Sequence, residues 1–266
     1  MFLLKNIPLY LGYWFFVVAI YFLRTGKWKF SGFSFSKTHY YLFAFVFLVP
    51  TLISTALGVS LAPVFHFALL GVIGVIGETA ASIWWHTYFG QRFWIYRVQT
   101  VYHKYTSWLN FIPWAVGGML YASVADQISH LYTKPYLFPL FFVTIGLCLL
   151  VQYSVFVFLY RKHTFHRVTF LNALFFFAPV IVLLLTLGYV FGSDMYVLAI
   201  LFGTIATGAE YLYGKATEFF ISKKMWTYTY LSVDRGHFTP LSIPLFILGG
   251  FYFIAIMQLL HSILWF

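Results

Sequence analysis

Two glutamates are the residues best suited to chemistry in this chain. Glu78 and Glu210 each lie inside a long apolar stretch, and 132 residues separate them. A carboxyl group at membrane depth is costly when it is charged and unpaired, so it usually faces a cavity or a partner. A matched pair would serve as general acid and base, as a proton relay or as a cation site. The alternative is structural, with each glutamate hydrogen-bonded across the helix bundle.

Two further polar residues follow the glutamates at the same spacing. His86 lies eight residues after Glu78, and Glu218 lies eight residues after Glu210, so each pair falls on one helix face. Different groups at matched positions suit proton transfer. The alternative is sequence drift at a helix end in contact with water.

Each glutamate is also followed by a segment that mixes aromatic side chains with cations. The matched residues are Arg92, Trp94 and Tyr96 in the first segment and Lys224, Trp226 and Tyr228 in the second. They form an aromatic belt at the level of the lipid head groups, or they close a substrate cavity and bind the substrate.

Metal and thiol chemistry have little support. His130 and His261 each end a Gln-x-x-His sequence, and they are either haem or metal ligands or polar helix ends. The usual metal-binding spacings are absent, so no metal site and no particular cofactor is predicted. Cys148 is the single cysteine, which excludes a disulfide within the chain.

The elements that position these residues are membrane helices. Hydrophobic residues make up 62% of the chain and charged residues 8%, and the mean hydropathy is +0.86, which is typical of membrane proteins. Eight apolar stretches are long enough to cross a bilayer, which takes about 20 helical residues. They lie near 7–24, 39–58, 61–85, 107–127, 136–160, 168–191, 195–215 and 240–264.

The chain repeats itself at the spacing of the glutamates. The matched positions include Gly71 and Gly203, Trp94 and Trp226, Tyr96 and Tyr228, and Gly117-Gly118 and Gly249-Gly250. We therefore predict an all-α integral membrane protein of eight transmembrane helices. Residues 1–133 and 134–266 would be parallel four-helix repeats, related by a pseudo-two-fold axis along the membrane normal.

Small residues precede each glutamate at helical spacing. They are Gly71, Gly74 and Gly77 in one helix and Gly203, Ala206 and Ala209 in the other. This spacing predicts a face on which another helix approaches closely, and the Gly-Gly pairs predict close packing at the axis.

The charge distribution predicts orientation. The net charge is +10, and 14 of the 16 Lys and Arg residues lie in or beside the loops after the odd-numbered helices. By the positive-inside rule these loops are cytoplasmic and both termini are outside, in a cytoplasmic (inner) membrane. The expected partners are anionic lipid head groups rather than nucleic acid. No oligomeric state is predicted.

A family resemblance adds to these predictions. The acid upstream, Trp226-x-Tyr228, Gly236 and Ile243-Pro244 together resemble a motif of membrane-embedded carotenoid-modifying proteins, the lycopene-cyclase-like and carotenoid-hydratase-like groups. Lycopene-cyclase-like proteins carry paired acids directly after the proline, where this chain has Leu245-Phe246. The resemblance therefore implies that Glu78 and Glu210 take the role of the acids.

Three functions fit these residues. The first is a membrane enzyme that acts on an apolar isoprenoid or lipid, with the glutamates as acid and base and the aromatic residues shaping the pocket. The second is a proton- or cation-coupled transporter that uses the same glutamates. The third is a membrane subunit that holds a pigment or haem.

Overall fold

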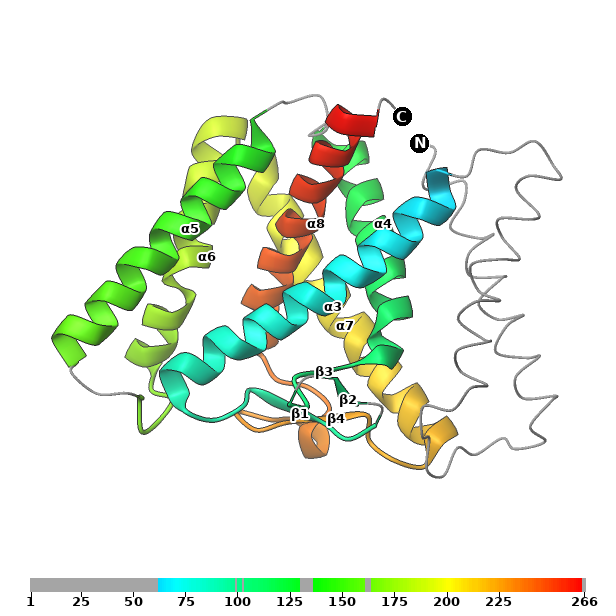
Figure 1. Cartoon of the computed structure of the whole chain (residues 1–266), viewed down its shortest axis with the longest axis vertical. Coiled ribbons are helices and arrows are strands. Elements are labelled where there is room, and N and C mark those ends of the chain that lie inside the picture. The colour runs from blue at the N-terminus through cyan, green and yellow to red at the C-terminus, as the bar shows by residue number, and fades with distance from the viewer. Residues whose placement is uncertain (1–61, 99, 102, 130–135, 161–163, 265–266) are drawn as a thin grey trace, which may run out of the picture.

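Six long α-helices make up most of the described chain (Figure 1). The computed structural model describes residues 62–98, 100–101, 103–129, 136–160 and 164–264. The helices are α3 (Ala62–Phe89), α4 (Phe111–Ser129), α5 (Leu137–Val155), α6 (Phe170–Phe191), α7 (Asp194–Ile221) and α8 (Ser242–Leu264), and a π-helical turn, Phe156–Tyr160, extends α5. The predicted helices at 7–24 and 39–58 lie outside the described residues.

The chain is an integral membrane protein. Within the described residues, five helical segments are long and apolar enough to cross a bilayer. They are His66–Phe89, Leu137–Tyr160, Phe170–Phe191, Asp194–Phe219 and Ser242–Leu260. The remaining helix, predicted at 107–127, begins later, and its apolar part is the shorter segment Phe111–Ala122.

Short strands lie at one end of the helix bundle, below the helices in Figure 1. They are β1 (Trp94–Tyr96), β2 (Thr100–Val101), β3 (Thr106–Ser107) and β4 (Trp226–Tyr228), with 3-10 turns at Trp108–Asn110 (η1) and Asp234–Gly236 (η4). β1 pairs antiparallel with β4, and β2 pairs with β3. The helical fold class is confirmed, but the two aromatic segments that we expected as loops form strands and pair with each other. We call this end of the molecule the loop face.

Proline and glycine positions explain where the helices begin and how they pack. Pro113 and Pro244 are each the third residue of a helix, where the missing N–H has no partner within the helix to lose. α3 packs on α4, and α7 packs on α8. The predicted small-residue face is confirmed at Gly71, where an added Cβ would come within 2.7 Å of the Phe111 ring of α4.

Enlarging Gly71 should therefore separate α3 from α4. We expect Gly71→Val to lower the free energy of unfolding by about 1–3 kcal/mol, because the extra carbons have no space. Gly146→Val on α5 is the matched control, because no atom lies within 4 Å of a Cβ added there. Thermal unfolding in detergent measures both, and equal transition temperatures would contradict the packing described here.

Candidate functional site

Glu78 is held by a complete set of hydrogen-bond donors. Its buried carboxylate accepts hydrogen bonds from the hydroxyls of Tyr96 and Thr106, from the Asn110 amide at 2.9 and 3.0 Å, and from Trp114 Nε1 at 3.3 Å. The Asn110 amide nitrogen and the Trp114 indole nitrogen are hydrogen-bond donors only, and a carboxylate has about four acceptor sites. The donor set therefore saturates both oxygens of Glu78.

Glu210 has a much poorer set of partners. Its Oε1 accepts a hydrogen bond from the Tyr228 hydroxyl. Its Oε2 is buried and has no hydrogen-bond partner among the described residues. Buried polar atoms are nearly always paired, so an unpaired carboxyl oxygen marks a place where a proton or a ligand can be received.

The strand pair places the two tyrosines. Tyr96 and Tyr228 end β1 and β4, and both are buried. Burial raises the pKa of each phenol well above its ordinary value of 10. Both hydroxyls therefore stay protonated at neutral pH and donate hydrogen bonds to the glutamates.

Two cavities of about 270 Å³ each meet at the carboxyl groups. One lies between α3, α5 and α8 and is called the α3–α8 cavity; the other is the α4–α7 cavity. Both are lined mainly by apolar side chains, and their walls share Glu78, Trp114, Glu210 and Phe246. The two glutamates therefore face common space, which the sequence did not decide.

The predicted aromatic residues line these cavities. Trp94 and Tyr228 border the α3–α8 cavity, whereas Tyr96 and Trp226 border the α4–α7 cavity. The strand pair thus contributes one tryptophan and one tyrosine to each cavity, and the two come from opposite strands. The structure brings both glutamates and all four of these aromatic residues into one site.

The two glycines of each Gly-Gly pair have different surroundings. Gly118 packs tightly, because an added Cβ would lie 2.9 Å from the Phe253 ring, and Gly250 packs against Phe202 in the same way. Gly117 and Gly249 instead line the α4–α7 and α3–α8 cavities, with no atom within 4 Å of an added Cβ. The prediction of close packing holds for the second glycine of each pair, and the first leaves space for the cavity.

His86 and Glu218 lie outside the cavity walls. His86 Nδ1 is 2.5 Å from the Tyr105 hydroxyl, and His237 Nε2 is 2.6 Å from Glu218 Oε2. The two pairs have the same spacing of 19 residues. Each residue is thus paired with a side chain of the following loop rather than with a glutamate of the site.

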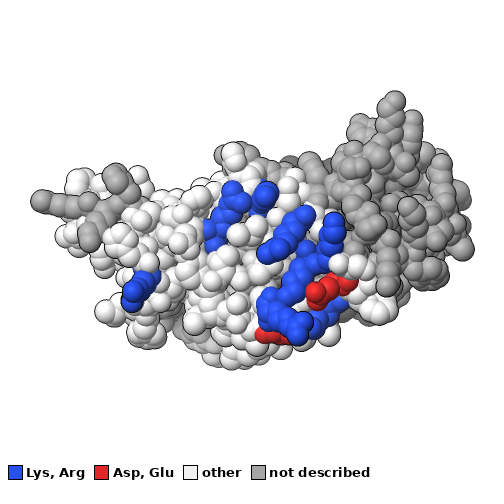
Figure 2. Space-filling view, turned by 90° about the horizontal axis from the view of Figure 1, so that it is seen from below, with Lys and Arg blue, Asp and Glu red and all other residues white. Residues whose placement is uncertain are grey.

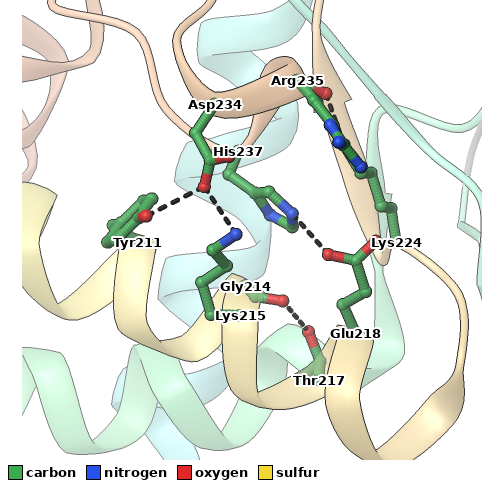
Figure 3. Close-up of polar contacts among 9 residues, drawn as sticks. All are labelled: Tyr211, Gly214, Lys215, Thr217, Glu218, Lys224, Asp234, Arg235 and His237. Atoms are coloured by element: carbon green, nitrogen blue, oxygen red, sulfur yellow. Dashed lines mark hydrogen bonds and ion pairs between the residues drawn. The ribbon is translucent and has the colours of Figure 1, made fainter.

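The two predicted cations also lie outside the cavity walls. The Arg92 guanidinium lies over the Tyr105 ring, 5.4 Å from its centroid. Lys224 Nζ donates a hydrogen bond of 2.5 Å to the Arg235 carbonyl (Figure 3). Both residues therefore order the loop face, and direct substrate contact remains a prediction without support from their position.

A charged cluster joins the C-terminal half of α7 to the loop that follows it (Figure 3). Asp234 Oδ2 accepts hydrogen bonds from Lys215 Nζ at 2.6 Å and from the Tyr211 hydroxyl at 2.9 Å. Lys215 holds the pKa of Asp234 below its ordinary value of 3.8, and Tyr211 adds to this effect. Asp234 and Arg235 both have positive φ, so the contact fixes a turn that most residues disfavour.

This cluster predicts a pH-dependent turn. Because the folded-state pKa of Asp234 is lowered, its stabilising contribution is present above about pH 4 and is lost as the pH falls through the folded-state value. At neutral pH we expect the Gly236 and His237 amides to exchange hydrogen faster in Asp234→Asn than in the wild type. At strongly acid pH the two proteins should converge. A difference that persists unchanged in acid would contradict the assignment.

Cations gather on the loop face. Figure 2 views the molecule from this side and shows Lys and Arg spread over it, with few acidic residues. The exposed cations of the two strand-bearing loops include Arg97, Lys104, Lys223 and Arg235. This distribution agrees with the predicted gathering of Lys and Arg in the loops after the odd-numbered helices.

The described residues contain no group of three or more His, Cys, Asp or Glu side chains that could hold a metal ion. His130 lies outside the described residues, and the His261 side chain is not described. The pair therefore stays a prediction, and so does its proposed role as haem or metal ligands.

The residues that hold Glu78 were not predicted from the sequence. Thr106, Asn110 and Trp114 come from β3, the η1 turn and the start of α4. At the 132-residue spacing their counterparts are Phe238, Ser242 and Phe246, of which only Ser242 has a side-chain donor. This difference was a visible signal that the two glutamates are held unequally.

Comparison with known proteins adds no identification: no protein-family model, curated protein or solved structure matches this chain.

Proposed function

We propose that this protein is a membrane-embedded enzyme that acts on an apolar isoprenoid or lipid by carboxyl acid–base chemistry. The observation that carries the proposal is that both glutamates lie in the shared wall of two apolar cavities. Exposed apolar residues form part of both walls, including Ile76 in the α3–α8 cavity and Ile205 in the α4–α7 cavity. A substrate would therefore enter sideways from the bilayer.

The glutamates would have different roles in this reaction. Glu210 would transfer the proton, because its Oε2 is free of protein donors. Glu78, which is saturated by four donor side chains, would be a fixed negative charge beside the reacting group. Fixed groups that need no reorganisation stabilise a developing positive charge effectively. The surrounding aromatic faces would add cation–π attraction.

We further propose that the site lies on the pseudo-two-fold axis of an eight-helix, four-plus-four duplication. Support comes from β1 and β4, which pair about Ile95 and Thr227, two residues at the repeat spacing. The hydrogen bonds that flank them match as well: Arg97 N–H donates to the Met225 carbonyl, and Thr229 N–H to the Phe93 carbonyl. The loop face would be cytoplasmic, against anionic lipid head groups.

Filling each cavity in turn tests the proposed site. We expect Gly117→Leu and Gly249→Leu to fold normally, because nothing lies within 4 Å of an added Cβ at either position. Each side chain would occupy one cavity, so at least one variant should raise the KM for an acyclic isoprenoid by about tenfold or more. Liquid chromatography with mass spectrometry of the products measures turnover in nanodiscs. Unchanged kinetics in both folded variants would contradict the site.

A second candidate function is a proton-coupled carrier of apolar cargo. It is favoured by one observation, that the unpaired oxygen of Glu210 belongs to a residue bordering both cavities. Flux of a labelled isoprenoid between vesicles under a pH gradient separates the two functions. An enzyme leaves a chemically changed product, whereas a carrier moves unchanged cargo in response to the gradient.

A further inference from the structure

Two unpaired polar atoms belong to the wall of the same cavity. Trp226 is 3% exposed, and its Nε1–H has no hydrogen-bond partner among the described residues. Glu210 Oε2 is likewise buried and unpaired. Both residues line the α4–α7 cavity. A buried donor or acceptor without a partner is costly, so these two atoms indicate a polar group that binds there.

Strand β4 carries both Trp226 and the tyrosine that binds Glu210. Side chains two residues apart on a strand point to the same side, so Trp226 and Tyr228 project together from β4. The Tyr228 hydroxyl holds the other oxygen of Glu210. The Trp226 ring packs on α7 one turn after Glu210: a Cβ added at Gly214 would lie 3.0 Å from its Cζ2 atom.

The chemistry of the two atoms selects the ligand. The indole N–H can only donate, whereas the carboxyl oxygen accepts when it is ionised. A hydroxyl group satisfies both, because it has one donor and two acceptor sites. A ketone cannot donate to the ionised Glu210 carboxylate, and a hydrocarbon satisfies neither atom. Resting on the proposed enzymatic function, we propose that the α4–α7 cavity binds the hydroxyl group of an apolar lipid alcohol through Trp226 and Glu210.

The α3–α8 cavity lacks this arrangement. The tryptophans that line it all have partners: Trp94 donates its Nε1–H to the Tyr105 carbonyl at 2.6 Å, Trp84 donates to Gln152 and Trp114 donates to Glu78. The oxygens of Glu78 are already taken by protein donors. The hydroxyl end of the ligand therefore belongs in the α4–α7 cavity, and the α3–α8 cavity accommodates purely apolar chain.

Binding of simple probes tests this inference. Purified protein in mild detergent is equilibrated with myristyl alcohol, with tetradecane, or with a methyl ketone of the same length, and the retained probe is measured by gas chromatography. We expect the alcohol to bind more tightly than the other two probes. Trp226→Phe should weaken alcohol binding about fivefold to tenfold, the effect of one hydrogen bond, and leave tetradecane binding unchanged. Trp85→Phe is the matched control and should keep the preference for alcohol, because the Trp85 indole is buried but lines neither cavity.

A second measurement follows binding in the wild type, and the variant serves only to assign the resonance. In the wild type labelled with ¹⁵N at the indole nitrogens, the alcohol should shift one indole resonance that tetradecane leaves in place, and that resonance should be missing in Trp226→Phe. Equal binding of the alcohol and either other probe, or an unshifted Trp226 resonance, would overturn the inference and leave water as the group in the cavity. Selective alcohol binding without any turnover would support the inference while contradicting the enzymatic function.

Discussion

Turnover of an isoprenoid substrate should fall by about 10²–10⁴-fold when Glu210 is replaced by Gln, which is the range that a single general acid or base contributes. The variant should still fold, because the side-chain carbonyl of Gln can accept the hydrogen bond that the Tyr228 hydroxyl donates to Glu210. It cannot give or take a proton at the position of Oε2. Product formation in nanodiscs measures the loss.

The control for this variant removes a carboxyl group elsewhere on the same helix. Asp194 is exposed at the start of α7, so Asp194→Asn should retain turnover within about twofold. If Glu210→Gln were folded and equally active, Glu210 would not be the proton-transferring group and the proposed function would fail. Loss of activity in both variants would instead indicate a general effect of charge on α7.

The second large effect concerns stability and should separate the two glutamates. We expect Glu78→Ala to lower the free energy of unfolding by at least about 3 kcal/mol. The substitution leaves the buried donors of Tyr96, Thr106 and Asn110, and the half-buried indole N–H of Trp114, without their acceptor. Each buried polar group left unpaired costs about 1–3 kcal/mol, and the losses add where water cannot enter.

Glu210→Ala is the matched comparison, because the same atoms are removed from the equivalent position of the predicted repeat. Only the Tyr228 hydroxyl loses its acceptor there, so the expected loss is about 1 kcal/mol. Thermal unfolding in detergent compares the two variants directly. Equal losses, or a larger loss at Glu210, would show that the donor set around Glu78 does not stabilise the fold.

Much of the helical framework was predictable from local composition. Long apolar stretches must form helices in a bilayer, because only internal hydrogen bonding satisfies the backbone there. Five membrane-crossing segments within the described residues confirm this prediction. Helix ends were less predictable: α3 continues to Phe89 beyond the expected 85, because the aromatic residues there pack in a buried cluster with Trp85 and Phe93.

The strand pairing was beyond local prediction. Trp94–Tyr96 and Trp226–Tyr228 are each only three residues long, and neither segment alone shows the alternation of a longer strand. Their pairing joins segments that are far apart in the chain. It exists because the helices bring the two loops to the same face of the bundle.

The membrane class was predictable from composition and from the length of the apolar stretches. The two carboxyl groups and the aromatic residues near them were also predictable, because a glutamate inside an apolar helix is costly and therefore conspicuous. The tertiary structure alone decided that both carboxyl groups border the same two cavities and that they differ in their hydrogen bonds. The physical reason is that hydrogen-bond partners and cavities depend on how the loops pack against the helix bundle. Asn110 and Trp114 reach Glu78 only because the chain folds back from β3 into α4 beside α3.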